Sequence, residues 1–305
     1  MLSYAVRRLL GAIPTLLVIL TITFFLVRLA PGGPFDGERS LPAEIERNLA
    51  AVYHLDEPLP MQYLRYLGQV VQGDFGPSFK YKDFSVTQLI WSGFPVSLQL
   101  GGTAMLLAVV VGTALGAFAA LRQNSGLDHA VMGTAMFGIA VPNFVIAPLL
   151  TLVLGVHLGL LPTGGWGTWQ QMLLPVVALA LPQIAYIARM TRASMIELLR
   201  SNFIRTARAK GLPERVTILR HALKGALLPV VSYLGPATAA VITGSVVIEQ
   251  IFGIPGIGRY FVQGALNRDY TLVMGVVIFY GVLIILFNLI VDLAYGLLDP
   301  RVRYD

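Results

Sequence analysis

Long apolar runs without a single charged side chain constrain this chain more than any other feature. These runs cover Leu9–Val27, Phe84–Leu121, Ala130–Ala188, Gly225–Ile248 and Tyr270–Val291. About 20 consecutive apolar residues are enough for a helix to cross the hydrocarbon core of a bilayer. Charged residues make up only 12% of the chain, whereas soluble domains carry about 25%. The sequence therefore predicts an all-α polytopic membrane protein.

The lengths of the runs predict six transmembrane helices. The run Ala130–Ala188 is long enough for two crossings, and a glycine-rich loop around Gly155–Gly167 separates them. The expected spans are residues 7–29, 95–121, 130–154, 172–194, 225–248 and 271–297. The run that starts at Phe84 is too long for one span, so we expect Phe84–Phe94 to form a separate interfacial helix with Trp91 at the headgroups.

One connector between spans is strongly basic. From Arg189 to Lys224 the chain has nine Lys or Arg residues and two acidic residues. Short basic loops next to spans stay in the cytoplasm. Placing this connector there makes the protein multi-pass with both termini cytoplasmic. The first span, which resembles a signal peptide, then remains uncleaved because it is of full spanning length and no A-x-A site follows it.

The connector also carries a helix-break-helix pattern. Helix-forming residues run up to Lys210, Gly211-Leu212-Pro213 interrupts them, and a second helical run begins at Glu214. A structured element of this kind suits docking to a cytoplasmic partner. The alternative interpretation is an anchor for anionic lipid headgroups.

The polar segment Pro31–Asp83 is the one sizeable region outside the predicted spans. Leu41–Leu55 and Pro60–Gln72 read as short amphipathic helices. The segment is too small for a core of its own, so we expect it to pack as a cap on the helices. A second punctuated segment, Gly253–Gly258, predicts a tight turn.

Few polar residues fall at membrane depth. Asn143, Asn288 and Asp292 are the candidates for a transport pathway, because polar groups in spans usually face the bundle interior. Asp292 lies near the cytoplasmic end, so pairing with an arginine or snorkelling is the alternative. Glu249 suits either an exterior gate or docking role, or plain solvation.

Prolines are the second indication of a pathway. We expect seven of them inside helices, where each frees a carbonyl that should face neighbouring helices or a wet cavity. These are Pro14, Pro142, Pro148, Pro175, Pro182, Pro229 and Pro236. Ordinary proline in membrane helices is the equally weighted alternative.

Several classes of chemistry are excluded by the residues. There is no cysteine, the four histidines lack metal-ligand spacing, and neither a nucleophile elbow nor a nucleotide-binding P-loop occurs. We therefore expect no catalytic residue, no metal site and no cofactor in this chain. The net charge of +6 follows from the basic cytoplasmic side and does not indicate nucleic acid.

Several motifs together resemble type I ABC importer permeases of the oligopeptide/dipeptide/nickel branch, and among them the B-type subunits of oligopeptide permeases. In the family's cytoplasmic motif, Ala207, Gly211 and Leu223 match, while Arg205, His221 and Lys224 replace Glu, Ile and Pro, as is typical of the peptide branch. Further matching stretches are RRLLGAIPTLLVI, GDFGPS at Gly73–Ser78, SNFIRTARAKGL, HALKGALLPV, GIPGIG and the ending DPRVRY. The resemblance covers essentially the whole chain.

The resemblance implies the fold, the partners and the role. Residues 1–94 would hold the first span and the extracytoplasmic segment, and residues 95–305 the importer transmembrane domain, with a coupling helix around 201–224. A second homologous permease subunit, two ATPase subunits that bind ATP and Mg, and an extracytoplasmic peptide-binding protein would complete a bacterial inner-membrane importer. The residues coupling to the ATPases would be Arg205, Thr206, Ala207, Arg208, Ala209, Lys210, Gly211, Leu212 and Pro213.

Other functions remain open at this point. A secondary transporter or channel driven by an ion gradient is the main alternative, although inverted repeats and intramembrane proton relays are not evident. Within the family, a dipeptide, murein peptide or nickel permease is equally compatible with these motifs.

Overall fold

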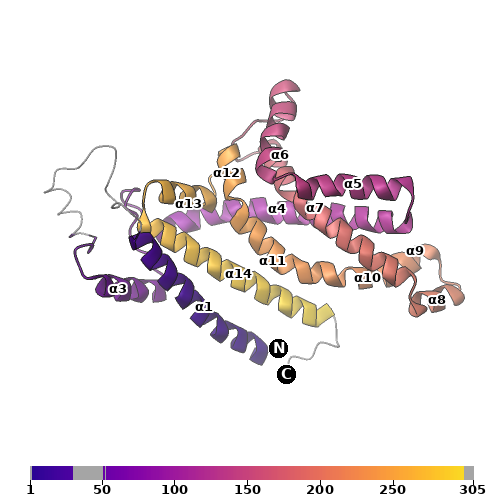
Figure 1. The fold of residues 1–305 in the computed structure, drawn as a ribbon, viewed down its shortest axis with the longest axis horizontal. Helices are drawn as coiled ribbons and strands as arrows, with labels where there is room; N and C mark the ends of the chain where they lie inside the picture. The colour runs from indigo at the N-terminus through magenta and orange to yellow at the C-terminus, as the bar shows by residue number, and fades with distance from the viewer. Residues whose placement is uncertain (1, 30–50, 52, 299–305) are drawn as a thin grey trace. The chain divides into compact units, whose positions relative to one another are not determined.

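The computed structural model describes residues 2–29, 51 and 53–298, and Figure 1 shows its helical architecture. Apart from one isolated bridge between Pro77 and Ser85, the regular structure in these residues is helical. The all-α prediction is confirmed. Residues 299–304, which carry the DPRVRY motif, lie outside the described residues.

Four single helices are long and apolar enough to cross a membrane, and two bent pairs raise the number to six in the described chain. The single helices are α1 (Leu2–Leu29), α4 (Val86–Leu121), α7 (Trp169–Leu199) and α14 (Tyr270–Leu298). One pair joins α5 (Gly126–Ala140) to α6 (Asn143–Leu150) with its π-helical extension η1 (Thr151–His157). The other joins α9 (Glu214–Val216), η2 (Thr217–Ala222) and α10 (Leu223–Ala226) to α11 (Leu228–Gly244).

The described chain divides into two compact units. The first holds residues 2–5, 97–254 and 286–298, and the second holds residues 6–29, 53–96 and 255–285. Helix α4 enters the first unit at Ser97, and α14 enters it at Leu286.

Helix α7 is the centre of the first unit, where it packs against α5, α6 and α11 (Figure 1). Close approach of α7 to α4 depends on Gly112 and Gly116 of α4, where the lack of a side chain lets the two helices pack closely. A Cβ added at Gly112 would lie 2.9 Å from the backbone oxygen of Ile184, so only glycine fits there.

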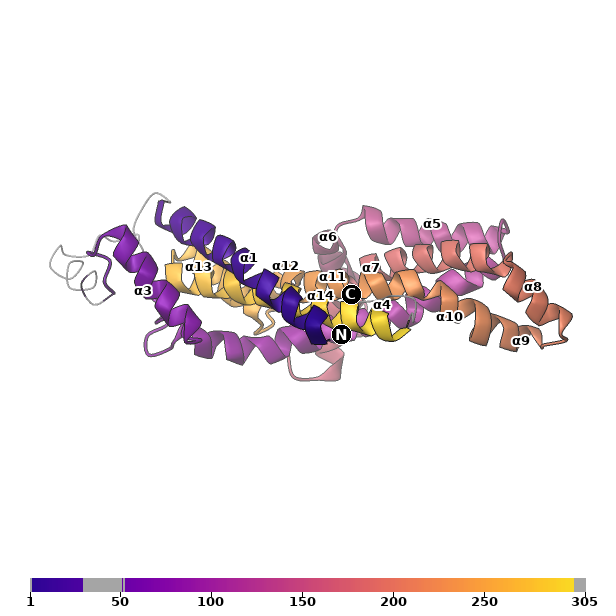
Figure 2. The same ribbon diagram turned by 90° about the horizontal axis from the view of Figure 1, so that it is seen from below.

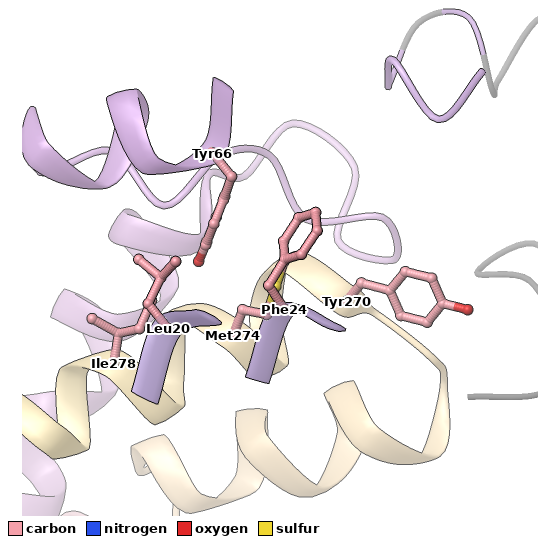
Figure 3. Close-up of a cluster of buried hydrophobic side chains, with 6 residues drawn as sticks. All are labelled: Leu20, Phe24, Tyr66, Tyr270, Met274 and Ile278. Atoms are coloured by element: carbon pink, nitrogen blue, oxygen red, sulfur yellow. The ribbon is translucent and has the colours of Figure 1, made fainter. Parts of the chain in front are cut away.

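The second unit is built around α1, α3 (Leu59–Val71) and α14. Figure 3 shows one cluster of buried side chains in its core, namely Leu20, Phe24, Tyr66, Tyr270, Met274 and Ile278. Helix α3 agrees with the helix predicted over Pro60–Gln72, and the hydroxyls of Thr21 and Tyr63 lie 2.7 Å apart where α3 meets α1. Most of the other predicted helix, Leu41–Leu55, lies outside the described residues.

A buried carboxylate joins the loop before α4 to the start of α14. Asp269 is fully buried and accepts hydrogen bonds from the Ser78 hydroxyl at 2.5 Å and the Phe79 amide at 3.1 Å. It also accepts one from the Leu272 amide at 3.1 Å, which caps the first turn of α14. No local pattern in the sequence indicates this anchor, because Asp269 lies about 190 positions after Ser78 and Phe79.

The structure overturns the expected interfacial helix as a separate element. Helix α4 runs without a break from Val86 to Leu121, with Pro95 inside it. At 36 residues it is about 54 Å long, which exceeds a hydrocarbon core of about 30 Å. The amphipathic stretch around Trp91 is therefore the first part of a long helix.

The predicted third span is broken. Helices α5 and α6 meet at an angle of 104°, with Val141 in an extended conformation between them. Pro142 is the cause, because proline lacks an amide hydrogen and disfavours helical geometry in the residue before it. Pro142 thus precedes α6 and is not inside a helix, and Pro229 lies in the first turn of α11, so both were wrongly placed in helix interiors.

The turn predicted at Gly253 is present, but a helix soon follows it. Helix α12 (Val246–Phe252) is capped by Gly253, which has a φ of +65°. The Ile254 amide donates to the backbone oxygen of Glu249 at 2.8 Å. Helix α13 (Ile257–Leu266) then begins, so the segment is more helical than its glycines indicated.

Candidate functional site

The basic connector folds as the predicted helix-break-helix. Helix α8 (Asn202–Ala209) is followed two residues later by Gly211, whose φ of +76° is the left-handed conformation that favours glycine. The Gly211 amide donates to the Arg208 oxygen at 2.9 Å and the Leu212 amide to the Ala207 oxygen at 3.3 Å. Pro213 then precedes α9, so a helix lies on each side of the turn.

A small hydrophobic cluster fixes α8 to the rest of the first unit. Ile204 is fully buried, and its cluster also contains Ala120 of α4, Met195 of α7, and Ala222 and Ala226 from η2 and α10. The connector therefore extends beyond α7 as a packed element and not as a loose loop (Figure 1, Figure 2). Ile204 was missed in the sequence because a single isoleucine among basic residues gives little periodicity.

The residues predicted to couple lie largely on the surface of the connector. Residues 205–213 are exposed, with the exception of Ala207, which is 8% exposed. The guanidinium of Arg208 pairs with the Glu214 carboxylate at 2.6 Å across the turn. Both side chains are largely exposed, so this pair contributes about 0–1 kcal/mol. Contacts with a partner would come from the exposed positions, since Ala207 faces inward.

Two of the arginines counted with the connector lie inside α7 instead. Arg192 donates two hydrogen bonds of 2.6 Å to the carboxylate of Asp128, which is buried in the first turn of α5. This bidentate pair joins α5 to α7. Arg189, one turn earlier, has its guanidinium 5.4 Å from the centre of the Tyr186 ring.

The predicted pathway residues lie on two elements. Asn143 is the first residue of α6, and Asn288 and Asp292 lie one turn apart on α14. The hydroxyl of Tyr4 donates to Asp292 at 3.2 Å. Asp292 therefore has a hydrogen-bonding partner in its own chain.

Glu249 is fully buried, so plain solvation is wrong for it. Its carboxylate accepts hydrogen bonds from the hydroxyls of Ser97 at 2.7 Å and Ser245 at 2.6 Å. Ser97 belongs to α4, and Ser245 lies between α11 and α12. Glu249 thus joins α4 to the end of α11, a role that its position in the sequence did not reveal.

The sequence matches a family over nearly its whole length. Residues 112–304 match the family described as binding-protein-dependent transport system inner membrane component, and residues 1–101 match the N-terminal segment of such membrane components. The chain belongs to this family.

Curated relatives match the chain from end to end. The oligopeptide transport system permease protein OppB of Escherichia coli strain K12 is 59% identical over 306 residues, which cover 100% of both chains. OppB of Haemophilus influenzae is 55% identical over the same length. The dipeptide transport system permease protein DppB of Bacillus subtilis is 48% identical over 303 residues, 99% of this chain and 98% of that protein.

Solved structures share the fold of part of the chain. An inward-facing conformation of the MetNI methionine ABC transporter aligns with a TM-score of 0.60 at 18% identity, over 69% of this chain and 96% of that one. A crystal structure of an amino acid ABC transporter aligns with a TM-score of 0.55 at 19% identity, over 68% and 94%. The predicted ABC importer transmembrane fold is confirmed.

Family membership defines the role of the chain. It is a multi-pass inner-membrane permease subunit of a binding-protein-dependent ABC transporter, and such subunits are not themselves enzymes. ATPase and binding-protein partners follow from this membership, and the family requires no cofactor in the membrane subunit. An ion-gradient-driven carrier or channel, the main alternative from the sequence, is not the function of an ABC permease subunit.

Proposed function

We propose that this chain forms half of the translocation pathway of an oligopeptide importer and couples to its ATPase subunits through residues 205–213. Full-length identity of 59% to OppB of Escherichia coli supports oligopeptides as the substrate, against 48% to a dipeptide permease. The observation that carries the coupling role is the connector itself, a packed helix-turn-helix with a basic exposed surface.

A rigid connector suits the transmission of force. Ile204 ties α8 to α4, α7, η2 and α10, so a displacement of α8 must move these helices with it. Shifting a two-state equilibrium from 1:99 to 99:1 takes about 5.5 kcal/mol of differential binding. A packed element can deliver this to the spans, whereas a flexible basic tail cannot.

A second, homologous membrane subunit would supply the other half of the pathway. One face of α11 carries the exposed residues Pro229, Ser232, Pro236 and Ala240 at intervals of three or four positions. Pro236 leaves the backbone oxygen of Ser232 without its helical donor on this face. Asn143, Asn288 and Asp292 remain additional pathway candidates, and both termini are assigned to the cytoplasm. The division into residues 1–94 and 95–305 is likewise part of this proposal.

The test is reconstitution of the complete importer in vesicles. The chain alone should take up no labelled peptide, and addition of the second permease, the two ATPases and the binding protein should produce ATP-dependent uptake. Uptake by the chain alone, driven by an ion gradient, would refute the proposal.

Variants at the connector test the coupling role. Leu212→Asp places a charge on the exposed turn, where the side chain is 38% exposed, and should uncouple ATP hydrolysis from transport while the chain still inserts. Gly211→Val should act similarly, because left-handed backbone costs an ordinary residue about 1–2 kcal/mol and a β-branched one more.

The matched control is Leu127→Asp, since Leu127, the second residue of α5, is 52% exposed and lies outside the basic connector. It should leave coupling intact. Gly211→Asn should also retain coupling because asparagine tolerates the left-handed conformation. Full coupling in both Leu212→Asp and Gly211→Val would show that the connector is not the docking element.

A further inference from the structure

Helix α7 carries a row of polar side chains at membrane depth. Gln183, Tyr186 and Arg189 follow one another at intervals of three residues, which places them on one face. The hydroxyl of Tyr233, on α11, donates to the side-chain oxygen of Gln183 at 2.6 Å, and the Tyr186 and Tyr233 rings lie 6.1 Å apart. A surface in contact with lipid tails does not carry such a row, because polar groups in spans face cavities or the protein interior.

Arg189 ends this row and keeps its hydrogen-bond donors available. It is exposed and lies ten residues before the end of α7, which is about 15 Å along the helix. Its guanidinium is held 5.4 Å from the centre of the Tyr186 ring, and within the described residues no carboxylate pairs with it. Arg192, one turn further on, is neutralised by Asp128. An unneutralised arginine at this depth is costly and indicates a functional site.

A small cavity opens beside Arg189 between α5 and α7, which lie side by side in Figure 1. Its volume is ≈ 210 Å³, and its lining includes Met132, Met136 and Ile139 of α5 and Ala185, Arg189 and Arg192 of α7. Methionine side chains are flexible and polarisable, so they adapt to differently shaped apolar groups. The larger groove of ≈ 860 Å³ along α5, α6 and η1 has no charged residue in its lining.

We propose that this cavity binds the carboxyl-terminal residue of the translocating peptide, with the α-carboxylate on Arg189 and the last side chain against Met132 and Met136. The inference rests on the proposed peptide-import function. A planar guanidinium binds a carboxylate through two parallel hydrogen bonds. The α-carboxylate is present in every linear peptide, and the methionine wall accepts different side chains, so the site reads the end of the peptide and not its sequence.

A lipid phosphate has the same anionic chemistry and is the competing ligand. Two observations favour the peptide. Arg189 lies inside α7 and not at its end, and the polar row continues from it to Gln183 and Tyr233, away from the end of the helix. A headgroup site would need neither feature.

The experiment compares two forms of one peptide in the complete reconstituted importer. Initial uptake of labelled tri-alanine with a free carboxylate is measured beside that of its C-terminal amide, for the wild type and for Arg189→Gln. The same binding protein is used throughout. Its own preference for the acid or the amide therefore cancels when uptake by the variant is divided by uptake by the wild type. The matched control is Arg122→Gln, which removes an exposed arginine outside the cavity.

Arg189→Gln should reduce uptake of the free acid roughly tenfold, the size of a lost hydrogen bond to a charged group, and change uptake of the amide by less than about twofold. In Arg189→Lys the loss of free-acid uptake relative to amide uptake should be intermediate, because lysine keeps the charge and loses the bidentate geometry. Arg122→Gln should leave the ratio unchanged.

Three results would overturn the assignment. Equal losses for acid and amide in Arg189→Gln would show a structural role. Equal losses that occur only in vesicles containing anionic lipid would show a headgroup site. An unchanged ratio in both Arg189 variants would show that the carboxylate is not bound there. Failure of the wild-type importer to take up either peptide would instead refute the proposed function itself.

Discussion

Tyr66 shows how one buried hydroxyl affects the second unit. The residue is 5% exposed, and its hydroxyl has no hydrogen-bonding partner among the described residues. Burial, with a smaller contribution from the charge of Asp74, raises the pKa of Tyr66 above its usual value. The same core holds Tyr63, whose hydroxyl by contrast lies 2.7 Å from that of Thr21. Two tyrosines on one helix therefore differ in what their hydroxyls contribute.

Replacing Tyr66 with phenylalanine should preserve or raise stability. An unsatisfied buried hydroxyl costs about 1–3 kcal/mol, and the variant removes it. Above pH of about 10 the unfolded chain loses the tyrosine proton while the folded chain retains it, so wild-type stability falls as pH rises through this range. Thermal unfolding of the purified subunit between pH 8 and 11 measures both effects, and Tyr66→Phe should show a shallower alkaline decline.

Tyr63→Phe is the matched control. It should lower stability at pH 8 by about 0.5–1.5 kcal/mol, because it removes a made hydrogen bond. If Tyr66→Phe lowers stability as much as Tyr63→Phe does, the hydroxyl of Tyr66 has a partner and the argument fails.

At the scale of elements, the pair Asp128–Arg192 joins α5 to α7. Removing one partner of a fully buried ion pair leaves an uncompensated charge and typically costs about 3–5 kcal/mol. Asp128 is buried but the Arg192 side chain is 26% exposed, so the loss should lie toward the lower end of this range. Asp128→Asn should therefore lower the thermal stability of the subunit strongly, whereas Glu214→Gln, which breaks the exposed pair with Arg208, should cost about 0–1 kcal/mol. Replacing both partners, in Asp128→Leu with Arg192→Met, should recover much of the loss. Similar losses in the two single variants would contradict a structural role for the buried pair.

The helices were largely predictable from the sequence, whereas the bend within one span and the contacts between distant helices were not. Apolar runs located the spans, because spanning a bilayer needs a fixed length of apolar helix. The break at Gly211-Leu212-Pro213 was also predictable, since it follows from local backbone chemistry. The bend before Pro142 was missed because proline is tolerated inside membrane helices. The pair Asp128–Arg192 and the buried Glu249 depend on residues distant in sequence, and no local pattern reveals such partners.

On the scale of the whole molecule, orientation across the membrane rests on charge distribution. The basic connector is the main determinant, because loops rich in lysine and arginine remain cytoplasmic. Its docking role, the position of Arg189 in the C-terminal third of α7 and the release of peptide toward the cytoplasm all depend on this orientation. One measurement therefore bears on each of these assignments.

Single-cysteine labelling tests the orientation directly, because the natural chain contains no cysteine. Lys82, Arg122 and Arg208 are exposed positions that fall on opposite predicted sides. In intact cells, an impermeant thiol reagent should label Lys82→Cys and leave Arg122→Cys and Arg208→Cys unlabelled. After permeabilisation all three should react, which shows that each introduced cysteine is accessible once the barrier is removed. Labelling of Arg208→Cys from outside would invert the topology, and a connector outside the cell could not meet an ATPase supplied with cytoplasmic ATP.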